Sequence, residues 1–123
     1  MRIKKTILIV DDDKLISGAL KRFLEGSGHI VSCCYNGMDA IEVSKERNYD
    51  VILTDYYMPG INGDEVCRLL RQHNPDVYII GCSSDAERKQ DFLNAGANVF
   101  LNKEELVQDL VHLISSCPAQ SLD

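Results

Sequence analysis

Two kinds of hydrophobic pattern alternate along this chain. Short runs that are almost continuously apolar predict strands buried on both faces, and they lie at residues 6–10, 29–35, 49–55, 77–82 and 98–101. The segments between them carry apolar residues at helical spacing, which predicts amphipathic helices. The first stripe consists of Leu15, Ile16, Ala19, Leu20, Phe23 and Leu24, and the last of Leu106, Val107, Leu110, Val111, Leu113 and Ile114.

Residues that favour the ends of helices and strands lie between these elements. Gly28, Gly37 and Gly96 stand at predicted element ends, where glycine tolerates a left-handed backbone. Ser84 followed by Glu87 has the spacing of a capping box, so we expect Ser84 to be the N-cap of the fourth helix. These signals agree with the hydrophobic pattern and predict five strands alternating with five helices.

The alternation of strands and helices predicts an α/β fold. Right-handed β-α-β crossovers place helices on both faces of a parallel sheet, in a flavodoxin-like doubly wound (βα)5 arrangement with strand order 2-1-3-4-5. A chain of 123 residues fits one such domain with a single core.

Charge and hydropathy narrow the classes of partner. The formal net charge of −6 argues against a nucleic-acid-binding surface, which would normally be basic. No run approaches the roughly 18 apolar residues that read as a membrane-spanning helix. The N-terminal MRIKK leads straight into a short strand-like run and does not resemble a secretory signal, so we expect a cytoplasmic protein that does not bind membranes.

The five cysteines do not predict a metal or redox site. They show no C-x-x-C spacing and are odd in number, so we expect reduced thiols that act mostly as small hydrophobic side chains. Cys33 and Cys34 are adjacent in a predicted strand and should therefore project to opposite faces of the sheet.

Polar side chains follow four of the five predicted strands. In a doubly wound sheet the carboxyl ends of the strands meet at one edge, where sites form. These side chains are Asp11, Asp12 and Asp13 after the first strand, Asp55 at the end of the third, Ser83 and Ser84 after the fourth, and Asn102 and Lys103 after the fifth.

The acidic residues decide the kind of site. A nucleotide-binding fold would carry a glycine-rich loop after the first strand, but this chain has Asp-Asp-Asp-Lys there, which repels a bare anion. Carboxylates brought close together must raise their pKa values or share a cation, and oxygen ligands without His or Cys favour Mg²⁺. An EF-hand starting at Asp11 is excluded, because Ile16 and Arg22 stand where it needs Gly and Glu.

Two of the acidic residues have different expected roles. Asp13 is most simply the N-cap of the first helix or an acid favoured by its dipole. Asp55 cannot be a cap in the same way, because Pro59 and Gly60 keep the chain in a loop until about Asn62. Asp55 is therefore left as a metal ligand, a nucleophile or both.

The motifs over nearly the whole chain resemble the receiver domain of two-component response regulators. That family has an acidic pair after strand 1, D-x-x-M-P-x-x-x-G after strand 3, Thr or Ser after strand 4 and Lys after strand 5. The second motif is complete here in Asp55, Met58, Pro59 and Gly63. The resemblance implies a phosphoryl-accepting switch that takes a phosphoryl group from a phosphohistidine on a sensor histidine kinase or phosphotransfer protein.

The resemblance also implies a role for each site residue. Asp55 would be the phosphoacceptor, and Lys103 and Ser83 would contact the phosphoryl group. Ser83 and Phe100 would form the switch, and the rotamer of Phe100 would report whether the domain is phosphorylated. Mg²⁺ would be the cofactor, and its protein ligands would be Asp11, Asp12, Asp55 and the backbone carbonyl of Tyr57. The only catalysis would be self-catalysed phosphoryl transfer and autodephosphorylation, so we do not expect an enzyme with a separate substrate.

Two departures from the family pattern leave alternatives open. Glu104 follows Lys103 where the family usually has proline behind a cis peptide. A non-proline cis bond costs about 2.5–4 kcal/mol, so we expect a trans Lys103–Glu104 bond. The interval from Ser83 to Gly96 is short for the family, which makes Cys82 and Ser84 alternatives to Ser83 as the switch side chain. A degenerate receiver acting as a phosphorylation-independent protein interaction module is the alternative function.

Residues 1–117 are expected to form the receiver domain and 118–123 a loose tail, with no output domain in this chain. Whether the chain stands alone or belongs to a longer regulator or hybrid kinase stays open, and so does its downstream protein target. A homodimer through the face of helix 4, strand 5 and helix 5 is compatible with the resemblance. A flavodoxin-like or phosphatase-type enzyme is disfavoured, because the chain has neither a phosphate-cradling glycine loop nor a D-x-D-x-T motif.

Overall fold

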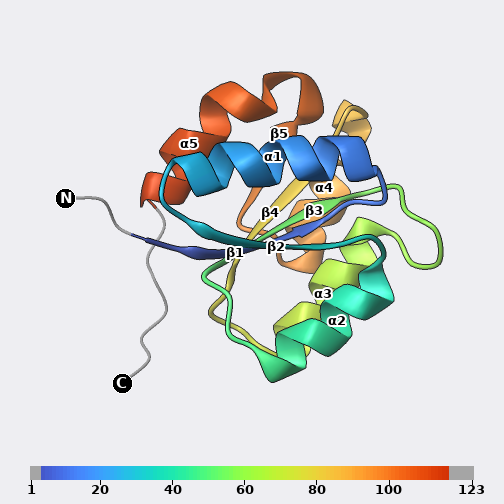
Figure 1. Cartoon of the computed structure of the whole chain (residues 1–123). Helices are drawn as coiled ribbons and strands as arrows, with labels where there is room; N and C mark the ends of the chain where they lie inside the picture. The colour runs from blue at the N-terminus through green and yellow to red at the C-terminus, as the bar shows by residue number, and fades with distance from the viewer. Residues whose placement is uncertain (1–3, 117–123) are drawn as a thin grey trace.

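A parallel five-stranded sheet in the order β2-β1-β3-β4-β5 runs through the middle of the molecule (Figure 1). The computed structural model describes residues 4–116, so the predicted tail and Cys117 lie outside the described residues. The strands are β1 Thr6–Val10, β2 Ile30–Cys34, β3 Val51–Asp55, β4 Tyr78–Ser83 and β5 Val99–Asn102. The predicted flavodoxin-like fold and strand order are therefore confirmed.

Helices cover both faces of this sheet (Figure 1). The α-helices are α1 Lys14–Gly26, α2 Gly37–Glu46, α3 Gly63–His73, α4 Lys89–Ala95 and α5 Leu106–Ser116. Two short 3₁₀ turns, η1 Ala86–Arg88 and η2 Lys103–Glu105, lead into α4 and α5. Within residues 4–116 no helix is long and apolar enough to cross a membrane.

The two faces of the sheet form two hydrophobic cores. Alternate residues of each strand point to opposite faces, so Leu8 packs with α2, α3 and α4 while Ile7 packs with α1 and α5. Cys33 contacts the α1–α5 core and Cys34 the other, as predicted from their adjacency. The four cysteines among the described residues are free thiols. Burial of both faces explains why the strand sequences are nearly continuous in apolar residues.

The predicted capping residues are partly right. Asp13 caps α1, because its carboxylate accepts hydrogen bonds from the backbone N–H groups of Leu15 and Ile16 at 3.0 and 3.2 Å. The prediction for Ser84 is wrong. β4 continues to Ser83, so Ser84 lies exposed in the connection, and the carboxylate of Asp85 caps η1 instead.

Glycines at element ends do not all serve the same purpose. Gly28 and Gly96 have φ values of 98° and 107°, in the left-handed region that favours glycine. Gly37 does not have a positive φ. It begins α2 at a point where a Cβ would collide with the side chains of Val66 and Ile61, so close packing explains this glycine. The left-handed expectation is wrong there.

Candidate functional site

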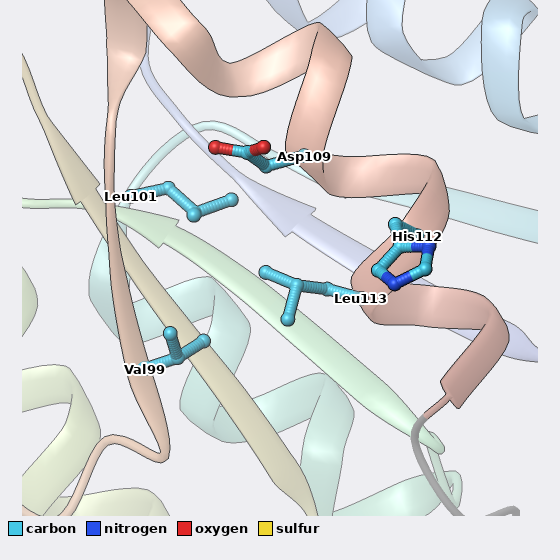
Figure 2. Close-up of a pocket in the computed structure, with 5 residues that line it drawn as sticks. All are labelled: Val99, Leu101, Asp109, His112 and Leu113. Carbon is cyan, nitrogen blue, oxygen red and sulfur yellow. The ribbon is translucent and has the colours of Figure 1, made fainter.

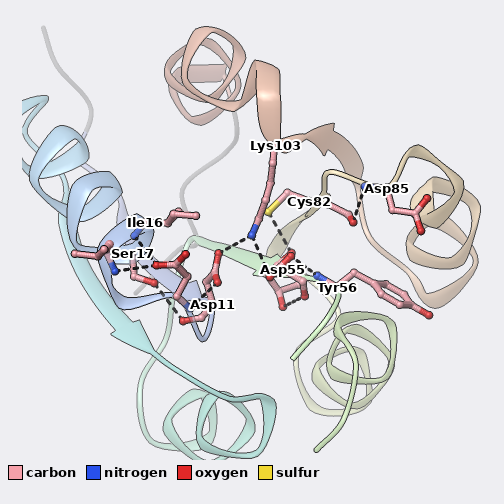
Figure 3. Close-up of polar contacts among 12 residues, drawn as sticks. Asp11, Ile16, Ser17, Asp55, Tyr56, Cys82, Asp85 and Lys103 are labelled. Atoms are coloured by element: carbon pink, nitrogen blue, oxygen red, sulfur yellow. Dashed lines mark hydrogen bonds and ion pairs between the residues drawn. The ribbon is translucent and has the colours of Figure 1, made fainter. Parts of the chain in front are cut away.

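Lys103 brings the acidic residues of two strands together at the carboxyl edge of the sheet. Its ammonium nitrogen Nζ lies 3.0 Å from Oδ2 of Asp11, which follows β1, and 3.1 Å from Oδ2 of Asp55, which ends β3. Figure 3 shows the lysine side chain reaching from the end of β5 to these two carboxylates. The structure therefore assembles, from three separate strands, the cluster that the strand ends predict.

Backbone hydrogen bonds hold both carboxylates in place. Oδ1 of Asp11 accepts from the N–H of Asp13 at 2.9 Å, and Oδ1 of Asp55 accepts from the N–H of Tyr56 at 2.8 Å. Asp11 is 3% exposed and Asp55 is 7% exposed. In each carboxylate one oxygen thus accepts a backbone hydrogen bond and the other faces Lys103, so both groups are held in a defined orientation.

Burial and charge act in opposite directions on this cluster. Burial raises the pKa of Asp55 above its ordinary value, and the hydrogen bond from Lys103 only partly offsets this effect. For Lys103, burial alone would lower the pKa, but the hydrogen bonds to Asp11 and Asp55 outweigh it and raise the pKa to about 12. The lysine therefore stays protonated at neutral pH and neutralises part of the carboxylate charge.

The acidic cluster has the donors that a hard divalent cation requires. One carboxylate oxygen from each of Asp11, Asp12 and Asp55 lies within 4.8 Å of the others. Asp12 is exposed while the other two are buried, so the cluster opens toward solvent on the Asp12 side. Carboxylate oxygens without His or Cys fit Mg²⁺ in chemistry. The predicted fourth donor, the backbone carbonyl of Tyr57, belongs to the loop that follows β3, two residues after Asp55.

Ser83 and its two neighbours differ clearly in their surroundings. Ser83 is buried at the end of β4, and its Oγ accepts a hydrogen bond from the N–H of Asp85 at 3.0 Å. The thiol of Cys82 faces the carbonyl oxygen of Thr54 at 3.5 Å, and burial raises its pKa. Ser84 is exposed. A serine hydroxyl that accepts a bond keeps its own hydrogen for donation, which suits Ser83 to a second, anionic partner.

Phe100 lies next to α4 rather than in the acidic cluster. Its ring centroid is 6.1 Å from that of Phe92, and the ring of Phe92 makes an edge contact at 5.6 Å with Tyr56, the residue after Asp55. Three aromatic rings thus connect β5, α4 and the end of β3. The sequence patterns singled out Phe100 but not Phe92, which is fully buried in α4.

Glu104 does not displace the lysine that precedes it. Among residues 4–116 every peptide bond is trans, including Lys103–Glu104 as predicted. The N–H of Glu104 donates to Oδ1 of Asn102 at 3.0 Å, and the chain then enters η2. Lys103 still contacts Asp11 and Asp55, so replacing the usual proline leaves the ion pairs of the site intact.

Tyr57 and Asp85 form a contact that the sequence reasoning did not identify. The hydroxyl of Tyr57 donates to Oδ2 of Asp85 at 2.8 Å. Asp85 also pairs with Arg88, whose guanidinium lies 5.4 Å from the ring centre of Tyr56. The sequence carries one indication of this contact, because polar residues follow two neighbouring strands. That pattern predicted Ser83 as a site residue but was not applied to Asp85.

A separate groove lies between β5 and α5, away from the acidic cluster. It has a volume of about 460 Å³ and is lined by Val99, Leu101, Asp109, His112 and Leu113 (Figure 2). Its lining is mainly apolar, with one acidic and one imidazole side chain on α5. Because no member of the acidic cluster lines it, the groove is not part of the candidate site.

Comparison with known proteins identifies the family. Residues 7–115 match the family model described as the response regulator receiver domain. The transcriptional regulatory protein ResD of Bacillus subtilis is 37% identical over 99 residues, which cover 79% of this chain and 41% of ResD. The response regulator MprA of Mycobacterium ulcerans is 31% identical over 107 residues, covering 85% of this chain and 46% of MprA. The chain thus spans less than half the length of these curated relatives.

Solved structures agree with the sequence matches. The response regulator TrrA from Thermotoga maritima, crystallised in complex with Mg²⁺-BeF, is 31% identical with a TM-score of 0.79, covering 89% of this chain and 98% of that chain. A two-component response regulator from Clostridium difficile is 26% identical with a TM-score of 0.82, covering 89% and 91%. With its sheet order and its lysine-bridged acidic cluster, the chain belongs to the receiver domain family of two-component response regulators.

Proposed function

We propose that this chain is a phosphoryl-accepting signalling switch in which Asp55 takes a phosphoryl group from a phosphohistidine. The donor is a sensor histidine kinase or a phosphotransfer protein. The observation that carries the proposal is the single ammonium of Lys103 shared between Asp11 and Asp55. Such an arrangement supplies a positioned carboxylate with a cation beside it, the two groups that phosphoryl transfer to a carboxylate needs.

The transfer itself makes and breaks one bond. A carboxylate oxygen of Asp55 attacks the phosphorus atom, the phosphorus–nitrogen bond to the imidazole breaks, and the imidazole leaves with the bonding electron pair. Asp55 becomes an acyl phosphate. Lys103, whose pKa is raised to about 12, carries its positive charge throughout and offsets the negative charge gathered on the phosphoryl oxygens.

Mg²⁺ is the cofactor in this proposal. Asp11, Asp12 and Asp55 would hold it, since their oxygens lie within 4.8 Å of one another, and the backbone carbonyl of Tyr57 would complete the protein ligands. The bound ion supplies further charge neutralisation for the transferring group. The Mg²⁺-BeF complex of TrrA, a protein 31% identical to this chain, supports this assignment.

Phosphorylation is proposed to act on Ser83 and then on Phe100. The hydroxyl of Ser83 donates to a phosphoryl oxygen and draws the end of β4 inward. Phe100 packs against Phe92 of α4, so a shift at the end of β4 is transmitted to the face of α4, β5 and α5. That face is the proposed contact for the downstream protein or a second copy of this chain.

The experiment that tests the function is phosphorylation of the full chain with acetyl phosphate and Mg²⁺. Intact-mass and peptide mass spectrometry should find one phosphoryl adduct on Asp55, and the Asp55→Asn variant should carry none. A wild-type protein without an adduct, or an adduct that persists in Asp55→Asn, contradicts the proposal. The phosphorylation-independent interaction module would then be the better description.

A further inference from the structure

We propose that Ser17 is a positioning residue for the cation site. Its buried hydroxyl fixes the peptide group that joins Asp11 to Asp12, and this peptide group sets where the two carboxylates lie relative to each other. The inference rests on the proposed function, because it concerns the residues to which that function assigns Mg²⁺. Ser17 belongs to α1 and lies outside the acidic cluster, so it acts on the cation site through the backbone.

The hydroxyl of Ser17 reaches back beyond the start of its own helix. A serine in a helix that bonds to the backbone usually donates to a carbonyl in the preceding turn of the same helix. Ser44 of α2 does this, since its Oγ donates to the carbonyl oxygen of Ile41 at 2.8 Å. Oγ of Ser17 instead donates at 3.2 Å to the carbonyl oxygen of Asp11, which precedes α1 (Figure 3). The bond therefore joins the body of α1 to the turn that carries two of the proposed ligands.

This bond lies in the interior of the protein, where water does not readily replace it. Ser17 is 0% exposed and Asp11 is 3% exposed. The N–H of Asp11 donates to the carbonyl oxygen of Cys34 at 3.1 Å, which continues the pairing of β1 with β2. A buried carbonyl that loses its donor is costly, so a turn without the Ser17 hydroxyl would rotate its peptide groups toward another partner. The hydroxyl thus determines the direction of the Asp11 carbonyl.

The direction of this carbonyl controls the position of Asp12. The peptide group between Asp11 and Asp12 is planar, so a fixed carbonyl also fixes the direction in which the chain continues to Asp12. Asp12 is exposed, so the backbone of the turn places its carboxylate rather than packing around the side chain. Mg²⁺ demands nearly ideal octahedral geometry, and the three carboxylates supply oxygens within 4.8 Å of one another. A small rotation of this peptide group therefore weakens binding of the ion.

The helix itself does not depend on the Ser17 hydroxyl. The carboxylate of Asp13 caps α1 through the N–H groups of Leu15 and Ile16, and the N–H of Ser17 donates to the carbonyl oxygen of Asp13 at 3.0 Å. Alanine has a higher helix propensity than serine. Ser17→Ala therefore keeps α1 and the fold, and its effect is confined to the turn between β1 and α1.

The test measures Mg²⁺ binding by the full chain without a phosphoryl donor. Mg²⁺ is titrated into the folded protein, and the amide NMR signals of Asp12 and Asp13 report the dissociation constant. Ser17→Ala removes the hydroxyl, and Ser17→Thr retains one. Ser44→Ala is the matched control, because Ser44 is also a buried helix serine that donates to a backbone carbonyl, but its partners belong to α2 and α3.

The dissociation constant for Mg²⁺ should rise about three- to ten-fold in Ser17→Ala, the binding equivalent of losing one hydrogen bond. Ser17→Thr and Ser44→Ala should bind Mg²⁺ as wild type does. Hydrogen exchange without any metal gives a second measurement. The amide hydrogen of Asp13, which bonds to the Asp11 carboxylate, should exchange faster in Ser17→Ala. That of Tyr56, bonded in the same way to Asp55, should exchange at the wild-type rate.

Three results overturn the role of Ser17. They are wild-type affinity for Mg²⁺ in Ser17→Ala, a loss in Ser17→Thr as large as in Ser17→Ala, and an equal loss in Ser44→Ala, which would make the effect one of general stability. Failure of the proposed function is distinguishable. A wild type that does not respond to Mg²⁺ contradicts the proposed cofactor together with this role, whereas a wild type that binds Mg²⁺ but takes up no phosphoryl group contradicts the proposed function alone.

Discussion

The phenyl ring of Phe92 lies over Gly81 in the space that a side chain at Gly81 would fill. Phe92 belongs to α4 and is fully buried, while Gly81 lies in the interior of β4. A Cβ built on Gly81 would collide with three atoms of the ring. The glycine therefore allows the short α4 to pack directly on the sheet, with the ring of Phe92 in the space beside Gly81.

Gly81→Ala should destabilise the fold by about 1–3 kcal/mol, because the added methyl group overpacks a core that cannot easily yield. Urea unfolding followed by circular dichroism measures the change. Adding Phe92→Leu, which replaces the ring with a smaller side chain, should recover part of the lost stability. Gly26→Ala is the control, since no atom lies within 4 Å of a Cβ there, and an equal loss in both alanine variants would contradict the packing argument.

Lys103→Met should raise the pKa of Asp55 further. The lysine hydrogen bond lowers that pKa against the larger effect of burial, so removing the ammonium leaves burial and the charge of Asp11 unopposed. Carboxyl NMR titration in the absence of Mg²⁺ measures the shift. Lys45→Met, at an exposed lysine that pairs with Glu42 at 3.7 Å, should leave the titration unchanged. An unaltered Asp55 titration in Lys103→Met would contradict the ion pair.

Mg²⁺ should stabilise the folded protein through the acidic cluster. An ion that binds only the native state raises the free energy of unfolding as its concentration exceeds the dissociation constant. Thermal unfolding with and without Mg²⁺ should therefore show a rise in Tm, and Asp12→Asn should reduce that rise by removing one proposed ligand.

Asp13→Asn is the matched control for this measurement. It removes the same charge one position away, and asparagine caps a helix as well as aspartate does. Its Tm should respond to Mg²⁺ as in wild type. Equal loss of the response in both variants would show that overall charge, rather than ligation by Asp12, governs the effect.

The bond between Tyr57 and Asp85 should show itself in a pH titration. Hydrogen bonding to Asp85 raises the pKa of Tyr57, and the bond from Tyr57 lowers the pKa of Asp85. The bond thus contributes stability above the ordinary pKa of an aspartate and below that of a tyrosine. Its contribution is lost as pH falls through the lowered pKa of Asp85 or rises through the raised pKa of Tyr57.

Ultraviolet titration measures the tyrosine side of this prediction. The difference between wild type and Tyr57→Phe isolates Tyr57 from the other tyrosines of the chain. The same difference taken in an Asp85→Ala background should show a lower pKa, close to that of an ordinary tyrosine. A Tyr57 that titrates identically with and without Asp85 would mean that the bond does not persist in solution.

The sequence alone determined the sheet, its strand order and the meeting of Asp11, Asp55 and Lys103. Hydrophobic periodicity is a local property that marks strands buried on both faces, and the handedness of β-α-β crossovers leaves few orders in which they can be arranged. Once that order is known, the carboxyl end of every strand lies at the same edge. Residues that directly follow strands can therefore be assigned to the site without coordinates.

Only the tertiary structure decided which side chains contact one another across the loops. Ser84 and Asp85 are both good caps, and the choice between them depended on β4 reaching Ser83. The packing of Phe92 on Gly81 and the bond from Tyr57 to Asp85 join elements whose separation is set by loop length and side-chain rotamers. Those quantities leave no periodic mark in a sequence, because they arise from packing between distant segments.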